Sequence, residues 1–241
     1  MAERLEKDLE TLARGLASAL GPDLVSLLLY GSAARGSRIE GRSDVNLLLV
    51  VRDASPAVLR RASPALAQWS RAGRYPPLIH SEAEWQAAAD VFPVEMDDIR
   101  DAHRVLAGSD PTGWIATKPA DVRREMERET RGVLTRLRAA WAALGGSGRE
   151  LESVLTASAG TVLVLLRAAI RLSGRRAPDG PGVVVSEAAA LCGFDAAAFD
   201  WVLAARQGQP PRRLEPFDDE ATKYLEAVEK LASWVNNHQE A

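Results

Sequence analysis

Apolar residues in the first half of the chain follow two patterns. Five leucines recur at helical spacing between residues 5 and 20, which predicts an amphipathic helix. Gly21-Pro22 ends that helix. Two apolar runs, 24–30 and 44–51, are rich in Leu and Val, and we expect buried strands there. The polar segment between the two runs predicts a short helical turn at 32–35.

Further along, the same patterns predict alternating helices and strands. Ser81-x-x-Glu84 matches a capping box and predicts a helix start. Val94 and Met96 alternate with charged residues, and we interpret 92–99 as a third main strand, with Pro93 tolerated near its start. The full expectation for this region is a helix over 56–72, a short strand at 78–80, a helix over 81–89, a strand over 92–99 and an edge strand at 102–106.

After Lys118 the pattern becomes almost wholly helical. Residues 151–172 form a strongly apolar segment, which favours a helix at the centre of a bundle. The chain is therefore predicted to be an α+β protein with two domains. Residues 1–118 form a mixed sheet flanked by helices, and residues 119–241 form an all-α helical bundle.

Composition narrows the functional classes. The 241 residues are 46% hydrophobic with a formal net charge of −3, which argues against a nucleic-acid binder with a basic surface. One cysteine and three histidines argue against disulfides, structural zinc and a His-rich metal site. The N-terminus lacks an apolar signal core, and no apolar run reaches membrane length. These features predict a cytoplasmic protein without a membrane segment.

The segment joining the two apolar runs carries the candidate chemistry. Gly31 permits a tight turn at a strand end, and Ser32 opens a turn whose N–H groups favour an anion. Asp44 and Asn46 alternate along the second strand, so both side chains are expected on one face. Glu95, flanked by apolar residues, is a third candidate, because a buried carboxylate is costly unless it is paired or bound to metal.

These residues resemble the signature of the polymerase-beta-like nucleotidyltransferase superfamily. Tyr30-Gly31-Ser32 matches its hydrophobic-Gly-(Gly/Ser) element. Asp44-Val45-Asn46-Leu47 matches its Asp-hydrophobic-(Asp/Glu)-hydrophobic element at similar spacing. The family has a third carboxylate on a later strand. A helical bundle behind such a domain is similar to the aminoglycoside nucleotidyltransferases and related bacterial proteins.

The resemblance implies a Mg²⁺-dependent reaction in which a nucleotide monophosphate passes from ATP or another nucleoside triphosphate to a hydroxyl acceptor, with the nucleotide between the two domains. The acceptor is a small molecule or a protein, and a homodimer is compatible with the family. The implied roles are catalysis by Asp44 and Glu95, metal ligation by Asp44, Asn46 and Glu95, and nucleotide binding by Gly31, Ser32, Arg35 and Ser43.

Asn46 departs from the pattern, because an amide offers one neutral oxygen where the family has a carboxylate. Mg²⁺ sites rely on carboxylates and substrate phosphates. Losing one of two close carboxylates is expected to slow turnover by roughly two or three orders of magnitude. Asp97 is the substitute for Glu95 on the same predicted strand face, and Asp98 is expected to face the opposite side as a structural partner.

Three hypotheses remain open. The chain is an active nucleotidyltransferase, or a weak or inactive relative that binds nucleotide or acts as an interaction module. A third hypothesis, a toxin–antitoxin component, is weaker because the helical half has no Arg-x4–6-His ribonuclease motif. Taken alone, the Gly31-Ser32 pair is also explained by an ordinary strand-to-helix turn without a binding role.

Overall fold

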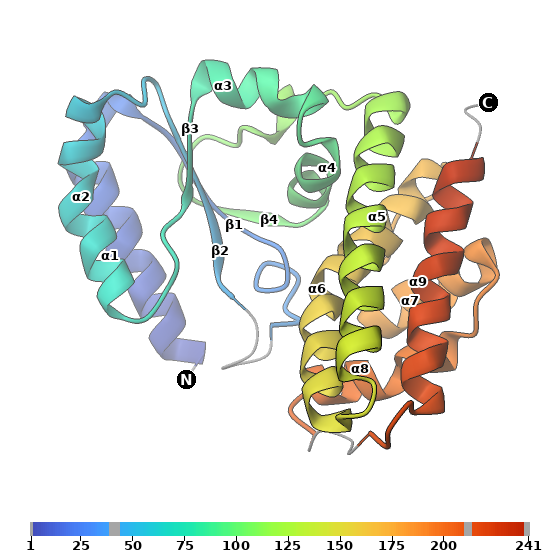
Figure 1. Cartoon of the computed structure of the whole chain (residues 1–241). Coiled ribbons are helices and arrows are strands. Elements are labelled where there is room, and N and C mark those ends of the chain that lie inside the picture. The colour runs from blue at the N-terminus through green and yellow to red at the C-terminus, as the bar shows by residue number, and fades with distance from the viewer. Residues whose placement is uncertain (1, 39–43, 210–213, 239–241) are drawn as a thin grey trace. The chain divides into compact units, whose positions relative to one another are not determined.

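The computed structural model describes residues 2–38, 44–209 and 214–238. The chain divides into two compact units (Figure 1). The first unit comprises Met1–Val91 and Met96–Ala116, and the second comprises Phe92–Glu95 and Thr117–Ala241. The helix Pro93–Asp101 therefore contributes residues to both units.

A four-stranded sheet forms the centre of the first unit, in the order β3-β2-β1-β4. The two predicted apolar runs form β1 and β2, and they pair antiparallel with Tyr30 opposite Asn46. β4 pairs antiparallel with β1, whereas β3 runs parallel to β2 with Leu78 beside Leu48. The strands are β1 (Leu24–Tyr30), β2 (Asn46–Val51), β3 (Leu78–Ser81) and β4 (His103–Gly108).

Both faces of the sheet are buried, which explains why β1 and β2 are almost continuously apolar. On one face, Leu27 and Leu49 pack against the amphipathic helices α1 (Ala2–Leu20) and α2 (Pro56–Arg71). On the other face, Leu28 and Leu48 pack against the helices that follow β3. Those helices are α3 (Glu82–Ala87), η2 (Ala88–Asp90) and α4 (Pro93–Asp101), with η3 (Thr112–Trp114) completing the layer. The 3-10 turn η1 (Gly21–Asp23) connects α1 to β1.

Several local signals are confirmed. Ser81 and Glu84 form the predicted capping box, in which the Ser81 hydroxyl accepts from the Glu84 N–H and the Glu84 carboxylate accepts from the Ser81 N–H. Pro56 begins α2, and Pro64 lies within it. The predicted strands 78–80 and 102–106 correspond to β3 and β4. The α+β class with a mixed sheet is confirmed.

The predicted strand over 92–99 is wrong, because these residues belong to helix α4. Pro93 is the first helical residue, a position where its missing N–H costs nothing. Met96 and Ile99 are buried against the sheet at helical spacing. The segment is too short for its Val94/Met96 alternation to distinguish a strand from a helix.

The second unit is helical. Its core is built around α6 (Gly148–Leu172), whose Leu155, Leu163 and Leu166 are buried. α5 (Pro119–Leu144) and α9 (Asp219–Asn237) pack with it, and Tyr224 of α9 is fully buried. The shorter helices are α7 (Pro181–Cys192), η4 (Ala196–Phe199) and α8 (Asp200–Arg206).

Within the described part of the chain, α6 is long and apolar enough to match a membrane span by length and composition. More than half of its most apolar window is buried inside the protein. The core helix of a bundle passes the same test, so this feature is accounted for by packing.

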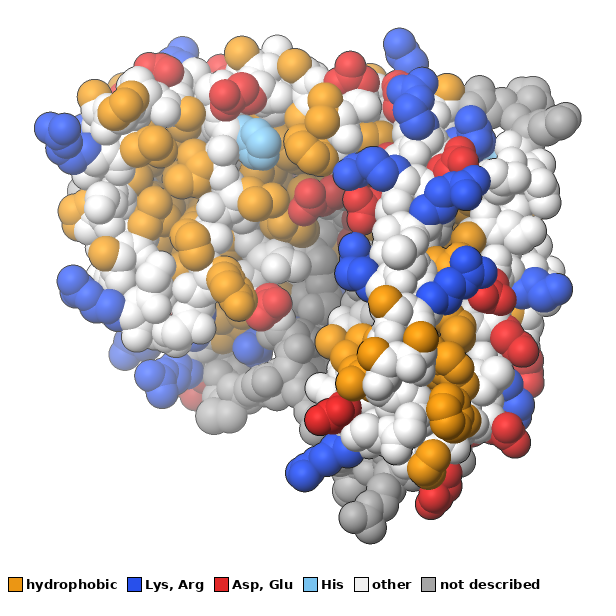
Figure 2. Space-filling view, viewed as in Figure 1, with side chains coloured by type: hydrophobic (Ala, Val, Ile, Leu, Met, Phe, Trp, Pro, Cys, Tyr) orange, Lys and Arg blue, Asp and Glu red, His pale blue; other side chains and the backbone are white. Residues whose placement is uncertain are grey.

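The exposed face of α5 carries interspersed charges of both signs, visible in Figure 2. Arg131 donates to Glu127 one turn earlier and to Asn236 of α9. Arg138 pairs with Glu229 of α9 at 2.8 Å. These arginines thus connect α5 to α9 at the surface.

Candidate functional site

The predicted phosphate turn follows directly after β1. Gly31 and Gly36 have φ angles of 72° and 70°, a left-handed conformation that favours glycine. The Arg35 N–H donates to the Gly31 carbonyl at 3.1 Å, and the Ser37 N–H donates to the Ser32 carbonyl at 3.0 Å. In the described chain, no hydrogen bond uses the N–H groups of residues 32–34. The turn therefore presents unused donors, as the first turn of a helix does.

Asn46 lies against this turn. Its backbone is opposite Tyr30 at the end of the β1–β2 ladder. A Cβ atom added at Gly31 would lie 3.2 Å from the Asn46 side-chain nitrogen, so the two residues are in direct proximity. Gly31 therefore provides both the left-handed backbone and the space that the Asn46 amide occupies.

Asp44 and Asn46 are both exposed, whereas Val45, which lies between them, and Leu47, which follows Asn46, are buried. Val45 and Leu47 pack into the core beneath α1 and α2. Because side chains alternate along a strand, Asn46 faces the side of the sheet that carries Leu48, and Asp44 follows the same alternation. The same-face arrangement predicted for Asp44 and Asn46 agrees with this burial pattern. Ser43, predicted to bind nucleotide, lies outside the described residues.

Arg35 leaves the turn toward α4. Its guanidinium donates to the Asp98 carboxylate at 2.8 Å and to the Asp98 backbone carbonyl at 3.1 Å. The side chains of Arg35 and Asp98 are only 2% and 10% exposed. The role of structural partner expected for Asp98 thus has a definite counterpart, 63 residues away in sequence.

Glu95 occupies the first turn of α4 and belongs to the second unit, whereas Asp44 and Asn46 belong to the first. The charge of Glu95 helps to raise the pKa of Glu125 of α5, whose carboxylate accepts a hydrogen bond from the Val94 N–H at 2.8 Å. The expectation that Asp97 substitutes for Glu95 on one strand face fails, because residues two apart on a helix do not share a face. Asp97 pairs with Arg100 at 2.7 Å.

The sheet itself offers little to a metal ion beyond Asp44. The two described strands that follow β2, with sequences Leu-Ile-His-Ser and His-Arg-Val-Leu-Ala-Gly, contain no Asp or Glu. Among residues 2–38, 44–209 and 214–238, no three His, Cys, Asp or Glu side chains cluster to hold a metal ion. One carboxylate and substrate phosphates can hold a Mg²⁺ ion, but these residues do not fit a site for two ions.

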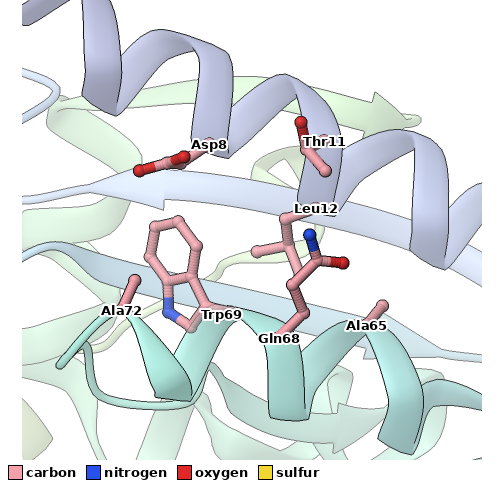
Figure 3. Close-up of a pocket in the computed structure, with 7 residues that line it drawn as sticks. All are labelled: Asp8, Thr11, Leu12, Ala65, Gln68, Trp69 and Ala72. Atoms are coloured by element: carbon pink, nitrogen blue, oxygen red, sulfur yellow. The ribbon is translucent and has the colours of Figure 1, made fainter.

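A small hollow lies between α1 and α2, on the opposite sheet face from Asn46 (Figure 3). Its volume of about 40 Å³ admits a few water molecules and excludes a nucleotide. The Trp69 indole N–H donates to the Tyr75 carbonyl, and the Arg74 guanidinium stacks on the Trp69 ring and pairs with Asp8. These contacts join α2 to α1, and the hollow is separate from the Gly31 turn.

Substituting Gly31 with alanine is expected to disturb the site directly. The added methyl group meets the Asn46 amide and the backbone is strained at φ 72°. We expect a loss of roughly 1–2 kcal/mol in the free energy of unfolding and displacement of the Asn46 side chain, measurable by urea denaturation and NMR. Gly73→Ala is the matched control, because it has the same backbone strain with no atom within 4 Å. An unmoved Asn46 amide resonance in Gly31→Ala would contradict the geometry.

Glu125 gives the second unit a specific pH dependence. Burial raises the pKa of its carboxyl, with smaller raising contributions from Glu129 and Glu95, against the Val94 N–H and Arg128, which lower it. A raised folded-state pKa favours the protonated form. Its stabilisation is therefore complete below the unfolded pKa of about 4.3 and is lost as pH rises through the folded value.

Glu125→Gln should remove this dependence. We expect the unfolding free energy of wild type, relative to that of the variant, to decline as pH rises from about 4 to 6. Urea denaturation across this range measures the difference. A constant difference between the two proteins would show that Glu125 has the same pKa in the folded and unfolded states.

The suspected resemblance is confirmed at the level of the fold, by a solved structure that is similar over almost the whole chain. The chain is similar to the crystal structure of spectinomycin adenyltransferase AAD(9) from Enterococcus faecialis with ATP and spectinomycin. The TM-score is 0.58 with 13% sequence identity, over 96% of this chain and 99% of that chain. No family model matches the sequence, and no curated protein matches it at a significant level.

Proposed function

We propose that this protein binds Mg·ATP or a similar nucleoside triphosphate at the turn after β1, and that its nucleotidyl transfer is weak. The observation that carries the proposal is the arrangement of Gly31, Asn46 and Asp44 at one end of the β1–β2 pair. The turn offers unused N–H donors to phosphate, and Asp44 supplies an exposed carboxylate two residues before Asn46.

The residues present support binding better than transfer. Mg²⁺ can be held by one carboxylate together with substrate phosphates, so Asp44 would ligate an ion that arrives with the nucleotide. When bound, such an ion neutralises phosphate charge and polarises the phosphoryl oxygens. Asn46 adds a neutral oxygen at most, and neither β3 nor β4 adds an acid. This set lacks the charge that a two-ion displacement needs.

Glu95 has a different place in this proposal from the one its sequence suggests. In the first turn of α4 it lies beside Glu125, and its charge contributes to the raised pKa of that carboxyl. We therefore do not assign it the role of metal ligand or general base. That role stays a prediction of the family resemblance.

A second candidate function is Mg²⁺-dependent transfer of AMP to the hydroxyl group of a small molecule. The observation that favours it is the fold shared with an adenyltransferase crystallised with ATP and spectinomycin. The two candidates differ in one measurable product, because transfer releases pyrophosphate whereas binding alone does not.

The test is a calorimetric titration of ATP into the protein with and without Mg²⁺, followed by a pyrophosphate assay with a panel of hydroxyl acceptors. We expect wild type to bind ATP more tightly with Mg²⁺ than without it. In Asp44→Ala, the gain in affinity from Mg²⁺ should be at least about tenfold smaller, which corresponds to about 1.4 kcal/mol. Asp53→Ala, a change of another acidic residue, is the control. Absence of binding to wild type would refute the proposal, and rapid pyrophosphate release would favour the second candidate.

A further inference from the structure

The turn after β1 is attached to α4 by a buried ion pair. Arg35 and Asp98 have side chains that are 2% and 10% exposed, and they meet at 2.8 Å. The same Arg35 nitrogen also donates to the Asp98 backbone carbonyl at 3.1 Å. The guanidinium of Arg35 therefore holds both the backbone and the side chain of Asp98 in α4.

Both ends of this pair are anchored independently. On the α4 side, Met96 and Ile99 are buried against the face of the sheet formed by Leu28 and Leu48. On the turn side, the Arg35 N–H is bonded to the Gly31 carbonyl, so the residue that reaches α4 also closes the turn. A shift of Arg35 must therefore move the turn.

The turn also contacts the residues of the candidate site. Gly31 lies against the Asn46 amide, and the donors of residues 32–34 lie between Gly31 and Arg35. A small rotation of this short segment would redirect those donors. Recognition of phosphate by backbone N–H groups depends on their direction, so the anchor of the turn controls the affinity of the site.

We propose that Arg35 and Asp98 are positioning residues that hold the Gly31–Gly36 turn in the orientation required to bind the triphosphate. The inference rests on the proposed function for the identity of the ligand. The direct phosphate contact that the sequence suggests for Arg35 is the alternative. Asp98 acts on the ligand only through Arg35 and the turn.

The two roles of Arg35 predict opposite effects of Asp98→Asn. A phosphate-binding Arg35 would be released from its partner, so affinity for Mg·ATP would stay the same or increase. A positioning pair loses its charge-assisted bond, which weakens the attachment of the turn to α4. We expect both Asp98→Asn and Arg35→Met to weaken Mg·ATP binding about tenfold in calorimetry, and the double variant to be no weaker than either single one.

A second readout needs no nucleotide. The amide hydrogens of Arg35 and Ser37 are bonded within the turn. We expect their exchange to accelerate at least about fivefold in Asp98→Asn. Arg104→Met is the control, because it removes the exposed Arg104–Glu6 ion pair in the same unit and should change neither measurement. Arg35→Lys, which keeps the cation without the planar fork, should fall between wild type and Arg35→Met and serves if Asp98→Asn fails to fold.

The outcomes separate this inference from the proposed function. Unchanged exchange, or unchanged or tighter Mg·ATP binding, in Asp98→Asn would overturn the positioning role. Wild type that binds no Mg·ATP would overturn the proposed function and the link to affinity. The anchoring of the turn by Asp98 would then stand or fall on the exchange rates alone.

Discussion

Combining Asn46→Asp with Leu78→Glu is expected to raise the rate of pyrophosphate release from Mg·ATP about a hundredfold over wild type, which corresponds to about 2.7 kcal/mol. The double variant adds one acidic residue at position 46 and a second on the neighbouring strand β3. Leu78 lies beside Leu48 in the parallel β2–β3 ladder and therefore on the sheet face toward which Asn46 points. Leu78 is 43% exposed, so a glutamate there remains in contact with water.

The matched control is Asn46→Asp with Leu78→Gln, which has the same side-chain length without the charge. Each single variant is measured alongside, with water and a panel of hydroxyl acceptors. Because a metal site depends on charge, the Glu version should exceed the Gln version at saturating Mg²⁺ and should lose its advantage without Mg²⁺. Equal rates for the Glu and Gln versions would mean that missing carboxylates do not limit transfer.

Replacing Gly148 with alanine is expected to destabilise the second unit by about 3 kcal/mol or more. Gly148 is the first residue of α6, and a Cβ atom there would lie 1.8 Å from the Leu214 carbonyl oxygen and 2.6 Å from its carbon. These are backbone atoms, and Leu214 is itself 4% exposed in the bundle core. Neither the start of α6 nor the backbone at Leu214 can move away without displacing buried residues.

Gly146 provides the comparison, because a Cβ atom there meets nothing within 4 Å. Gly146→Ala should change the free energy of unfolding by less than about 0.5 kcal/mol. Urea denaturation followed by circular dichroism and tryptophan fluorescence measures both variants. Equal stabilities would show that the chain at residue 214 does not pack on the start of α6.

Local signals were sufficient for most of the fold. The leucine spacing of α1, the apolar runs of β1 and β2 and the capping box of α3 each specify one structure without outside information. The sequence of α4 does not specify one structure, because nine residues with two alternating apolar positions fit either a strand or a helix. Pro93 was the decisive signal, since proline favours the first position of a helix.

The candidate site was predictable only where its residues are close in sequence. Gly31 directly follows β1, and Asp44 lies two residues before Asn46 at the start of β2, so alternation predicts that Asp44 and Asn46 share a face. The partner of Arg35 is 63 residues away, and no local pattern identifies Asp98 rather than Asp97. The strand assignment around Glu95 was wrong, since this residue lies in helix α4 and its charge raises the pKa of Glu125, whereas its predicted role at the site stays a prediction.

The decisive measurement is the affinity of wild type and Asn46→Asp for ATP, with and without Mg²⁺, by calorimetry. We predict that wild type binds Mg·ATP, that Asn46→Asp binds it about tenfold more tightly, and that the two proteins do not differ in this way without Mg²⁺. Absence of Mg·ATP binding to wild type, or identical Mg·ATP affinities of the two proteins, would contradict a nucleotide site in which Asn46 stands where a metal-binding carboxylate is missing.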